Sequence, residues 1–259
     1  VWEQKHEKAI KLSLQYSETK SFPWTGAANV QFPLVTVAAL QFLSRIGILT
    51  KGRNIARCDV IGPDPEGKEA MRAKRIGIHM SYQLVEEDRN WINDDEKAKF
   101  AASILGCSFK KTYFDPIEGI NISEYVPASN LVVDYYTKSF EKAQRVTHIH
   151  SGVSRNFIQE RVNRGIFLEM DRESGSMPSM NLLSMTADIV EGIQRPASGN
   201  QQTYEILEQH CLLDLDGDGY AEPYVISVRE DTCQVLRIVA RFFDEGDVFR
   251  VNDASVRRL

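Results

Sequence analysis

The segment from Pro33 to Ile48 places the strongest constraint on how this chain folds. Apolar residues fill most of its sixteen positions, and Pro33 at the start and Gly47 near the end are typical of helix ends. A helix needs about 20 apolar residues to cross a bilayer, so this one is too short to span a membrane. Because it is apolar on nearly every side, we expect Leu34 to Ile46, together with Trp24 in the preceding loop, to lie in the core or in a subunit contact.

The overall composition is that of a globular protein. The chain has 259 residues, of which 42% are hydrophobic and 26% are charged, so we expect neither a disordered chain nor a membrane protein. The 31 Lys and Arg against 36 Asp and Glu give a net charge of −5. Proteins that hold duplex DNA by neutralising its phosphates are usually basic. The charge therefore argues against tight, non-specific binding to DNA, and no membrane partner is expected.

The spacing of apolar and β-forming residues predicts an α+β fold. Four further helices are predicted, at 2–18, 68–87, 94–105 and 139–165. Residues rich in Val, Tyr and Phe predict two short strands at 109–114 and 130–136. Alternating apolar residues after Tyr204 predict a three-stranded antiparallel β meander.

These elements divide the chain into three parts. Residues 1–170 form a helix-rich body with a small sheet, and residues 204–259 form the antiparallel β meander. Between them, residues 171–203 are rich in Ser, Asp, Gly and Pro and hold one short helix, 182–193. We expect this connector to be flexible and to mark the domain boundary.

The four cysteines give no sign of a metal or redox motif. They are Cys58, Cys107, Cys211 and Cys233, with no C-x-x-C pair among them. Each lies in an apolar or strand-like run, and a core of this size needs no covalent link. Reduced, buried thiols are expected.

The sharpest local motif is the acidic run that begins at Asp214. Asp214, Asp216, Asp218 and Glu222 occupy relative positions one, three, five and nine, and Gly219 occupies position six, as in an EF-hand loop that binds Ca²⁺. Position twelve is Val225 and not the usual Glu, and strands are predicted on both sides. A hairpin turn in which Asp side chains bond their own backbone explains the same residues. Calcium is thus the candidate ion, and no cofactor is expected to be required.

Two other groups of residues have the chemistry of metal ligands. His148 and His150 would share a face if they lay in a strand, but the surrounding periodicity is helical and predicts that they diverge. The acidic runs 86–88 and 94–96 would suit a metal-dependent nuclease only if they converged in space. Their positions at helix termini favour a structural role. No nucleotide-binding or hydrolase motif is present in the sequence, so an enzyme is not predicted.

Several stretches, in order, resemble the portal proteins of tailed bacteriophages, especially those of short-tailed phages. They are 23–30 (PWTGAANV), 32–34 (FPL), 38–42 (AALQF), 79–84 (HMSYQL), 109–115 (FKKTYFD), 126–135 (VPASNLVVDY), 145–148 (RVTH), 207–211 (LEQHC) and 214–224 (DLDGDGYAEPY). No single stretch is diagnostic, but their order covers nearly the whole chain. The sequence is therefore identified as similar to a portal protein.

The resemblance implies a structural subunit of a ring, usually of twelve identical copies, at one vertex of the capsid. Its implied partners are copies of itself, the terminase motor that pumps double-stranded DNA through the ring, the capsid and scaffold proteins, and the tail or adaptor proteins. The implied location is the virion, and the host cytoplasm during assembly. The ring would serve genome packaging and later ejection, and ATP hydrolysis would belong to the terminase, which agrees with the lack of a catalytic set.

The length departs from the family pattern. Portal subunits are commonly about twice this size and carry wing, stem, clip and crown parts, whereas this sequence has a wing-like region without a recognisable stem or clip. We therefore expect a fragment of a longer subunit. Two alternatives remain open: a Ca²⁺-binding structural or interaction module built on the Asp214 run, and a metal-dependent nuclease.

Overall fold

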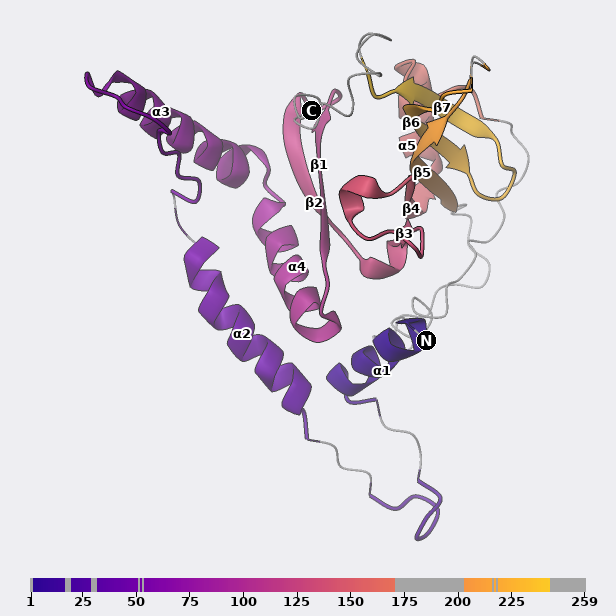
Figure 1. Cartoon of the computed structure of the whole chain (residues 1–259). Coiled ribbons are helices and arrows are strands. Elements are labelled where there is room, and N and C mark those ends of the chain that lie inside the picture. Colours follow the sequence, from indigo (N-terminus) through magenta and orange to yellow (C-terminus); the bar gives the residue numbers. More distant parts are fainter. Residues whose placement is uncertain are drawn as a thin grey trace. The chain divides into compact units, whose positions relative to one another are not determined.

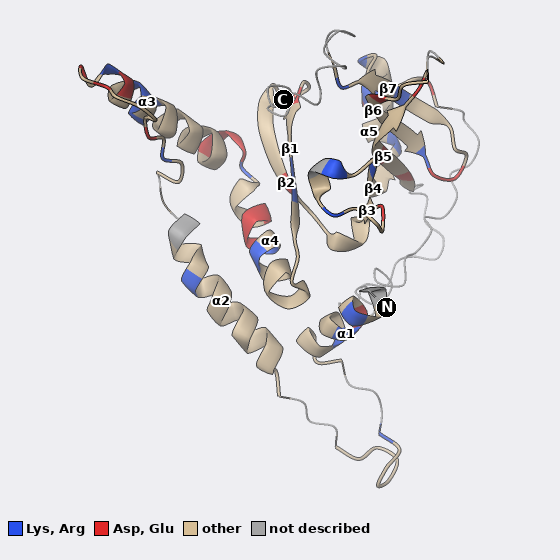
Figure 2. Cartoon of the chain, in the orientation of Figure 1, with Lys and Arg blue, Asp and Glu red and all other residues tan. Residues whose placement is uncertain are grey.

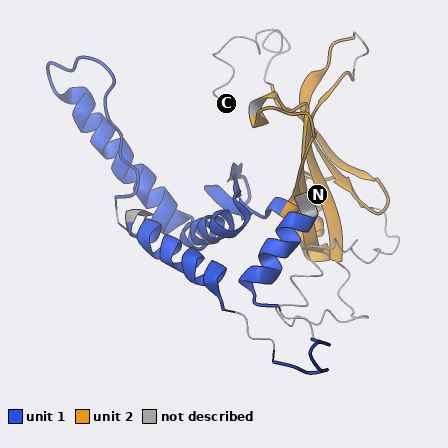
Figure 3. Cartoon of the chain, turned by 60° about the horizontal axis from the view of Figure 1, so that its bottom comes forward, with its two compact units in different colours: residues 1–128, 182–193 blue, residues 129–181, 194–259 orange. Residues whose placement is uncertain are grey.

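The computed structural model describes residues 2–16, 20–28, 32–50, 52, 54–170, 203–215, 217 and 219–242. These residues belong to two compact units, coloured separately in Figure 3: one ends at Ala128, and the other begins at Ser129 and continues through 203–242. The division thus falls before the predicted connector, because residues 129–170 belong with the C-terminal strands. Residues 171–202, including the predicted helix 182–193, and the end of the predicted meander after Phe242 lie outside the described residues.

The first unit contains four helices and a β-hairpin among its described residues (Figure 1). The helices are α1 (Trp2–Ser13), α2 (Leu34–Thr50), α3 (Lys68–Tyr82), which continues into a π-helical turn (Gln83–Glu87), and α4 (Trp91–Leu105). The hairpin is β1 (Phe109–Asp115) and β2 (Ile120–Val126), paired antiparallel in continuous register. The four helices predicted in this region are confirmed, with Gly106 ending α4 in the left-handed conformation at φ 78°. Strand β2 was not predicted.

Helix α2 buries only one stripe of its apolar surface. Ala39 and Gly47 are buried and Thr36, Leu43 and Ile46 are half-buried, a helical spacing that fits its packing against α1 and α4. The other side remains apolar and open, with Leu34 68% and Ile48 76% exposed. Figure 2 shows that α2 carries almost no charge along its length. Within a single chain, α2 is therefore buried along one side only, and its other apolar side is exposed.

The loop before α2 does not contribute to the core. Trp24 is 67% exposed, and Phe22 beside it is also exposed. Trp24 therefore lies outside the core of this chain, and the alternative expected for it, a subunit contact, stays a prediction. No helix formed by the described residues combines the length and the apolar character needed to cross a membrane.

Gly77 allows the chain to pass close to α3. A Cβ atom added at Gly77 would lie 3.1 Å from the carbonyl oxygen of Ala56. One turn later, the buried hydroxyl of Ser81 accepts a hydrogen bond from the Ala56 N–H at 3.0 Å and donates one to the Gly77 carbonyl at 2.8 Å. The segment around Ala56 can thus lie close to α3 because Gly77 has no side chain, and the Ser81 hydroxyl holds it there.

In its described residues, the second unit is a five-stranded antiparallel sheet with one α-helix. Its strands are β3 (Leu131–Val133), β4 (Arg145–Ser154), β5 (Thr203–Leu213), β6 (Glu222–Arg229) and β7 (Val235–Ala240), hydrogen-bonded in that order. Helix α5 (Arg155–Asn163) follows β4 directly, and Ser154 caps it by accepting a bond from the Phe157 N–H at 3.3 Å. The predicted meander corresponds to β5, β6 and β7, and the α+β class is confirmed.

The predicted helix at 139–165 is wrong over its middle section. Residues 145–154 form β4, and only 155–163 are α-helical. The local sequence also fits a strand, with Val146, His148 and His150 on one side and Thr147 and Ile149 on the other. Strand β5 supplies the partner that decides between the two structures. A bulge between His150 and Val153, with Gly152 at φ 73°, then turns the chain toward α5.

The core of the second unit lies where α5 meets the sheet. Ile158, Tyr204, Ile206 and Leu236 form a buried cluster, and Val153, Val162, Phe167 and Met170 pack around it. The Leu168 N–H donates to the Leu236 carbonyl at 2.8 Å, which fixes the chain after α5 along β7. Arg229 is fully buried beside this cluster, over the ring of Tyr204, and pairs with Asp231 at 2.5 Å.

Candidate functional site

The acidic loop between β5 and β6 is closed by its first residue. Asp214 accepts hydrogen bonds from the N–H of Gly217 at 2.7 Å and from that of Gly219 at 3.0 Å, one on each carboxylate oxygen. Both glycines have positive φ, and Glu222 begins β6 opposite Leu213. This is the arrangement of an Asp that bonds its own turn. Asp216 and Asp218 lie outside the described residues, so calcium binding stays a prediction.

Three of the acidic residues considered for a nuclease, Asp88, Asp94 and Asp95, form contacts within the first unit. Asp88 is buried, and its carboxylate accepts the N–H of Ser123 in β2 at 3.0 Å. Asp94 accepts the N–H of Tyr125 at 3.3 Å. Asp95 forms ion pairs with Lys99 and Lys110. These contacts give the two acidic runs a structural role more specific than the helix-terminus effect expected from the sequence.

The histidines that the sequence predicted to diverge lie side by side. His148 and His150 are both in β4, so their side chains share one face of the sheet, and their ring centroids are 4.0 Å apart. Strand β5 places Glu208 directly opposite His148, and His210 follows two residues later on the same face. We refer to His148, His150, Glu208 and His210 as the histidine cluster.

Glu208 connects two members of the histidine cluster. Its Oε2 atom lies 3.4 Å from Nε2 of His150, and its Oε1 atom lies 3.2 Å from Nε2 of His210. The side chains of His150, Glu208 and His210 are 29%, 21% and 35% exposed, so they are shielded in part and remain accessible to a small ion. As the side chains lie, no three His, Cys, Asp or Glu donors in the described part of the chain are arranged to hold a metal ion.

The surroundings of the histidine cluster add no further charge at the directly paired positions. The residues across from its members on adjacent strands are Leu131, Val146, Ile206, Val225 and Ser227. Two of the three imidazoles thus contact the one carboxylate, and the same face continues to the buried Ile206 and, on the neighbouring strands, to Arg229 and Arg237.

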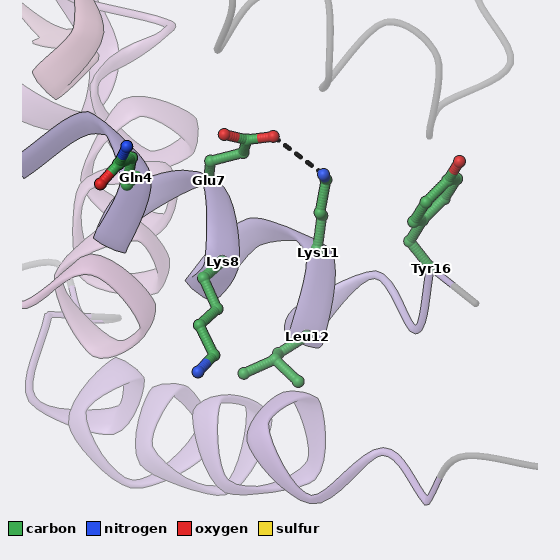
Figure 4. A pocket seen from close by; sticks show the side chains of 6 residues that line it. All are labelled: Gln4, Glu7, Lys8, Lys11, Leu12 and Tyr16. Carbon is green, nitrogen blue, oxygen red and sulfur yellow. Dashed lines mark ion pairs between the residues drawn. The ribbon is translucent and has the colours of Figure 1, made fainter. Parts of the chain in front are cut away.

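The surface of α1 carries a shallow depression. It has a volume of about 300 Å³ and is open to solvent. Figure 4 shows its lining, which is Gln4, Glu7, Lys8, Lys11, Leu12 and Tyr16. Glu7 and Lys11 form an ion pair at 2.8 Å, and nothing in this lining provides a nucleophile with an adjacent base.

None of the four cysteines forms a disulfide. Cys211 is buried, Cys58 and Cys107 are half-buried, and Cys233 is exposed in the turn before β7, so burial was wrongly expected for Cys233. Burial raises the pKa of the Cys211 thiol, and Arg145 opposes this shift without cancelling it. Burial also raises the pKa of Tyr125, in the same direction as the effect of Cys107.

Comparison of the chain with models of known protein families and with curated proteins finds no match to either. The functional argument therefore depends on the residues and on their geometry. Sequence reasoning missed the link between β4 and Glu208 and His210, because it predicted the wrong element for His148. The alternation of β-branched residues and histidines from Thr147 to His150 was the available signal.

Proposed function

We propose that this chain is part of a structural ring subunit of the portal type, which forms the channel assembly for packaging and ejection of double-stranded DNA at a capsid vertex. The stretches that resemble portal proteins, in the same order along the chain, support this proposal. These stretches extend over both compact units: residues 109–115 are strand β1, residues 145–148 begin β4, residues 207–211 lie in β5, and the stretch 214–224 ends in β6.

The observation that carries the proposal is the uncovered side of α2. A helix that is apolar on both sides, packed on one and open on the other, needs a second surface to cover it. In a ring of identical subunits, each copy can supply that surface to its neighbour. On this proposal, the exposed residues Leu34, Leu40 and Ile48 on the open side contact a neighbouring subunit.

The charge suits a channel wall that DNA passes without adhering. Five more acidic than basic residues per chain give a ring a negative field, which limits the neutralisation of phosphates that would hold the duplex. On this proposal the subunit has no catalytic residues of its own, and its partners are other copies, the terminase motor, capsid and scaffold proteins, and tail proteins.

The test is the assembly state. Light scattering and negative-stain imaging of the full subunit that contains this chain should show closed rings with a central channel. A stable monomer at every concentration reached would contradict the proposal. Calorimetric titration with Ca²⁺ tests the rival binding module, which predicts heat that disappears on Asp214→Asn.

A further inference from the structure

We propose that the histidine cluster on β4 and β5 is a binding site for a divalent transition metal ion, with Zn²⁺ as the reference ion. His148, His150 and His210 would supply nitrogen ligands, and Glu208 would supply an oxygen ligand. Three imidazoles and one carboxylate form a donor set that Zn²⁺ takes in a tetrahedral arrangement. This inference does not depend on the proposed ring function.

The backbone supplies the spacing that such a site needs. Two histidines at alternate positions of one strand face the same side, and the adjacent antiparallel strand brings its own alternate residues to that side. Both strands are internal to a five-stranded sheet, with β3 and β6 on their outer sides. The ligands are therefore mounted on the least mobile kind of scaffold, as a preorganised site requires.

Two of the three histidines already direct a ring nitrogen toward a common group. Nε2 of His150 and Nε2 of His210 both contact the carboxylate of Glu208, one at each oxygen. The donors do not surround a single point while the carboxylate lies between the two rings and contacts both. A rotation of the Glu208 side chain would let an ion take the place of these two contacts, and a rotation of His148, whose ring centroid lies 4.0 Å from that of His150, would bring the third nitrogen to the same ion.

The chemistry of the cluster favours a metal ion over a simple ion-pair role. One carboxylate can balance one imidazolium, whereas the cluster has three imidazoles and no further charged residue directly across from them. Three nitrogen donors beside a single carboxylate oxygen form a donor set that suits a divalent transition metal ion. The partial exposure of His150 and His210 gives the ion a path from solvent.

The experiment uses the full chain without an affinity tag, stripped of metal with a chelator. Titration with Co²⁺ should produce the visible absorption of a four-coordinate ion, saturating at one ion per chain, and Zn²⁺ should displace it. Near-ultraviolet charge-transfer absorption from sulfur should be absent, because no cysteine belongs to the site. Folded wild-type chain that gives no such visible absorption would overturn the proposal.

Variants assign the site to these residues. His150→Gln and His210→Gln should each weaken Zn²⁺ binding, measured by calorimetry, by at least about tenfold. His79→Gln is the matched control, because His79 is an exposed histidine on α3. Circular dichroism confirms that each variant is folded before titration. Equal affinity in wild type and in folded His150→Gln and His210→Gln would also overturn the proposal, as would loss of binding in His79→Gln alone.

Discussion

The carboxylate of Asp88 accepts a hydrogen bond from the backbone N–H of Ser123 at 3.0 Å, which ties the turn before α4 to strand β2. Asp94 forms the equivalent bond to Tyr125 from the first turn of α4. A two-stranded sheet has exposed edges, and such edges invite pairing with other chains. Here two acidic side chains occupy N–H groups of β2 and fix the hairpin to the helix.

Asp88→Ala should lower the free energy of unfolding of the first unit by about 1.5 to 3 kcal/mol, because the Ser123 N–H loses a charged acceptor in a buried position. Urea denaturation followed by circular dichroism measures the change. Asp59→Ala is the control, since Asp59 is an exposed acid in the same unit, and its effect should stay within about 0.5 kcal/mol. Equal effects of the two substitutions would show that the Asp88 bond contributes nothing specific.

Gly77→Val should destabilise the first unit by more than about 1 kcal/mol. The new side chain would meet the Ala56 carbonyl and force the adjacent segment away from α3. Ala70→Val introduces the same β-branched residue at an exposed position of the same helix. Val has a lower helix propensity than Ala but a higher one than Gly, so helix propensity alone would make Ala70→Val the more destabilising of the two. Thermal unfolding of both variants separates the two contributions, and a shift of the same size in both would rule out the close approach as the cause.

Leu40→Glu should prevent assembly of the full subunit into rings while leaving its helix content unchanged. Leu40 is exposed on α2, so a charge there is harmless in the free chain and costly in an apolar contact. Gln41→Glu adds the same charge at the next residue, which is polar and exposed, and should be much better tolerated. Light scattering gives the assembly state of each; rings that persist with Leu40→Glu would exclude this side of α2 as a contact.

Cys233 should react with a maleimide reagent much faster than Cys211. Cys233 is exposed, whereas Cys211 is buried and its raised pKa keeps it in the unreactive thiol form. The folded chain therefore holds this proton at pH values where the unfolded chain has lost it. The Cys211 thiol then lowers the free energy of unfolding as the pH rises above the ordinary cysteine range, and has no effect below that range. Mass spectrometry of the labelled peptides against time measures both rates, and comparable rates would contradict the burial of Cys211.

The elements that were predicted correctly are those whose type follows from the local sequence pattern alone. Helix α2 follows from an uninterrupted apolar run, and α4 follows from acidic residues in its first turn and Gly106 at its end. The strands β5, β6 and β7 follow from alternation. In each of these segments, one secondary structure buries the apolar residues much better than the other.

The elements that were missed depend on distant partners. Residues 145–154 fit a helix or a strand by local spacing, and their pairing with β5 decides the outcome. The histidine cluster was lost with this error, since His148 meets Glu208 only through that pairing. Asp88 and Asp94 lie near the start of a helix, where the helix dipole is a sufficient local explanation for acidic residues. Nothing in the sequence indicates that they accept hydrogen bonds from the N–H groups of β2.

The order of strands in the second unit has a consequence for how it folds. Strand β4 ends at Ser154, and the neighbour that completes it, β5, begins only at Thr203, with α5 between them. The central ladder therefore closes a long loop, and that closure costs chain entropy before any contact repays it. During synthesis, β4 emerges before its partner strand exists. Until Thr203 to Leu213 have been made, the edge of β4 that pairs with β5 has no partner, and unpaired strand edges of this kind favour aggregation.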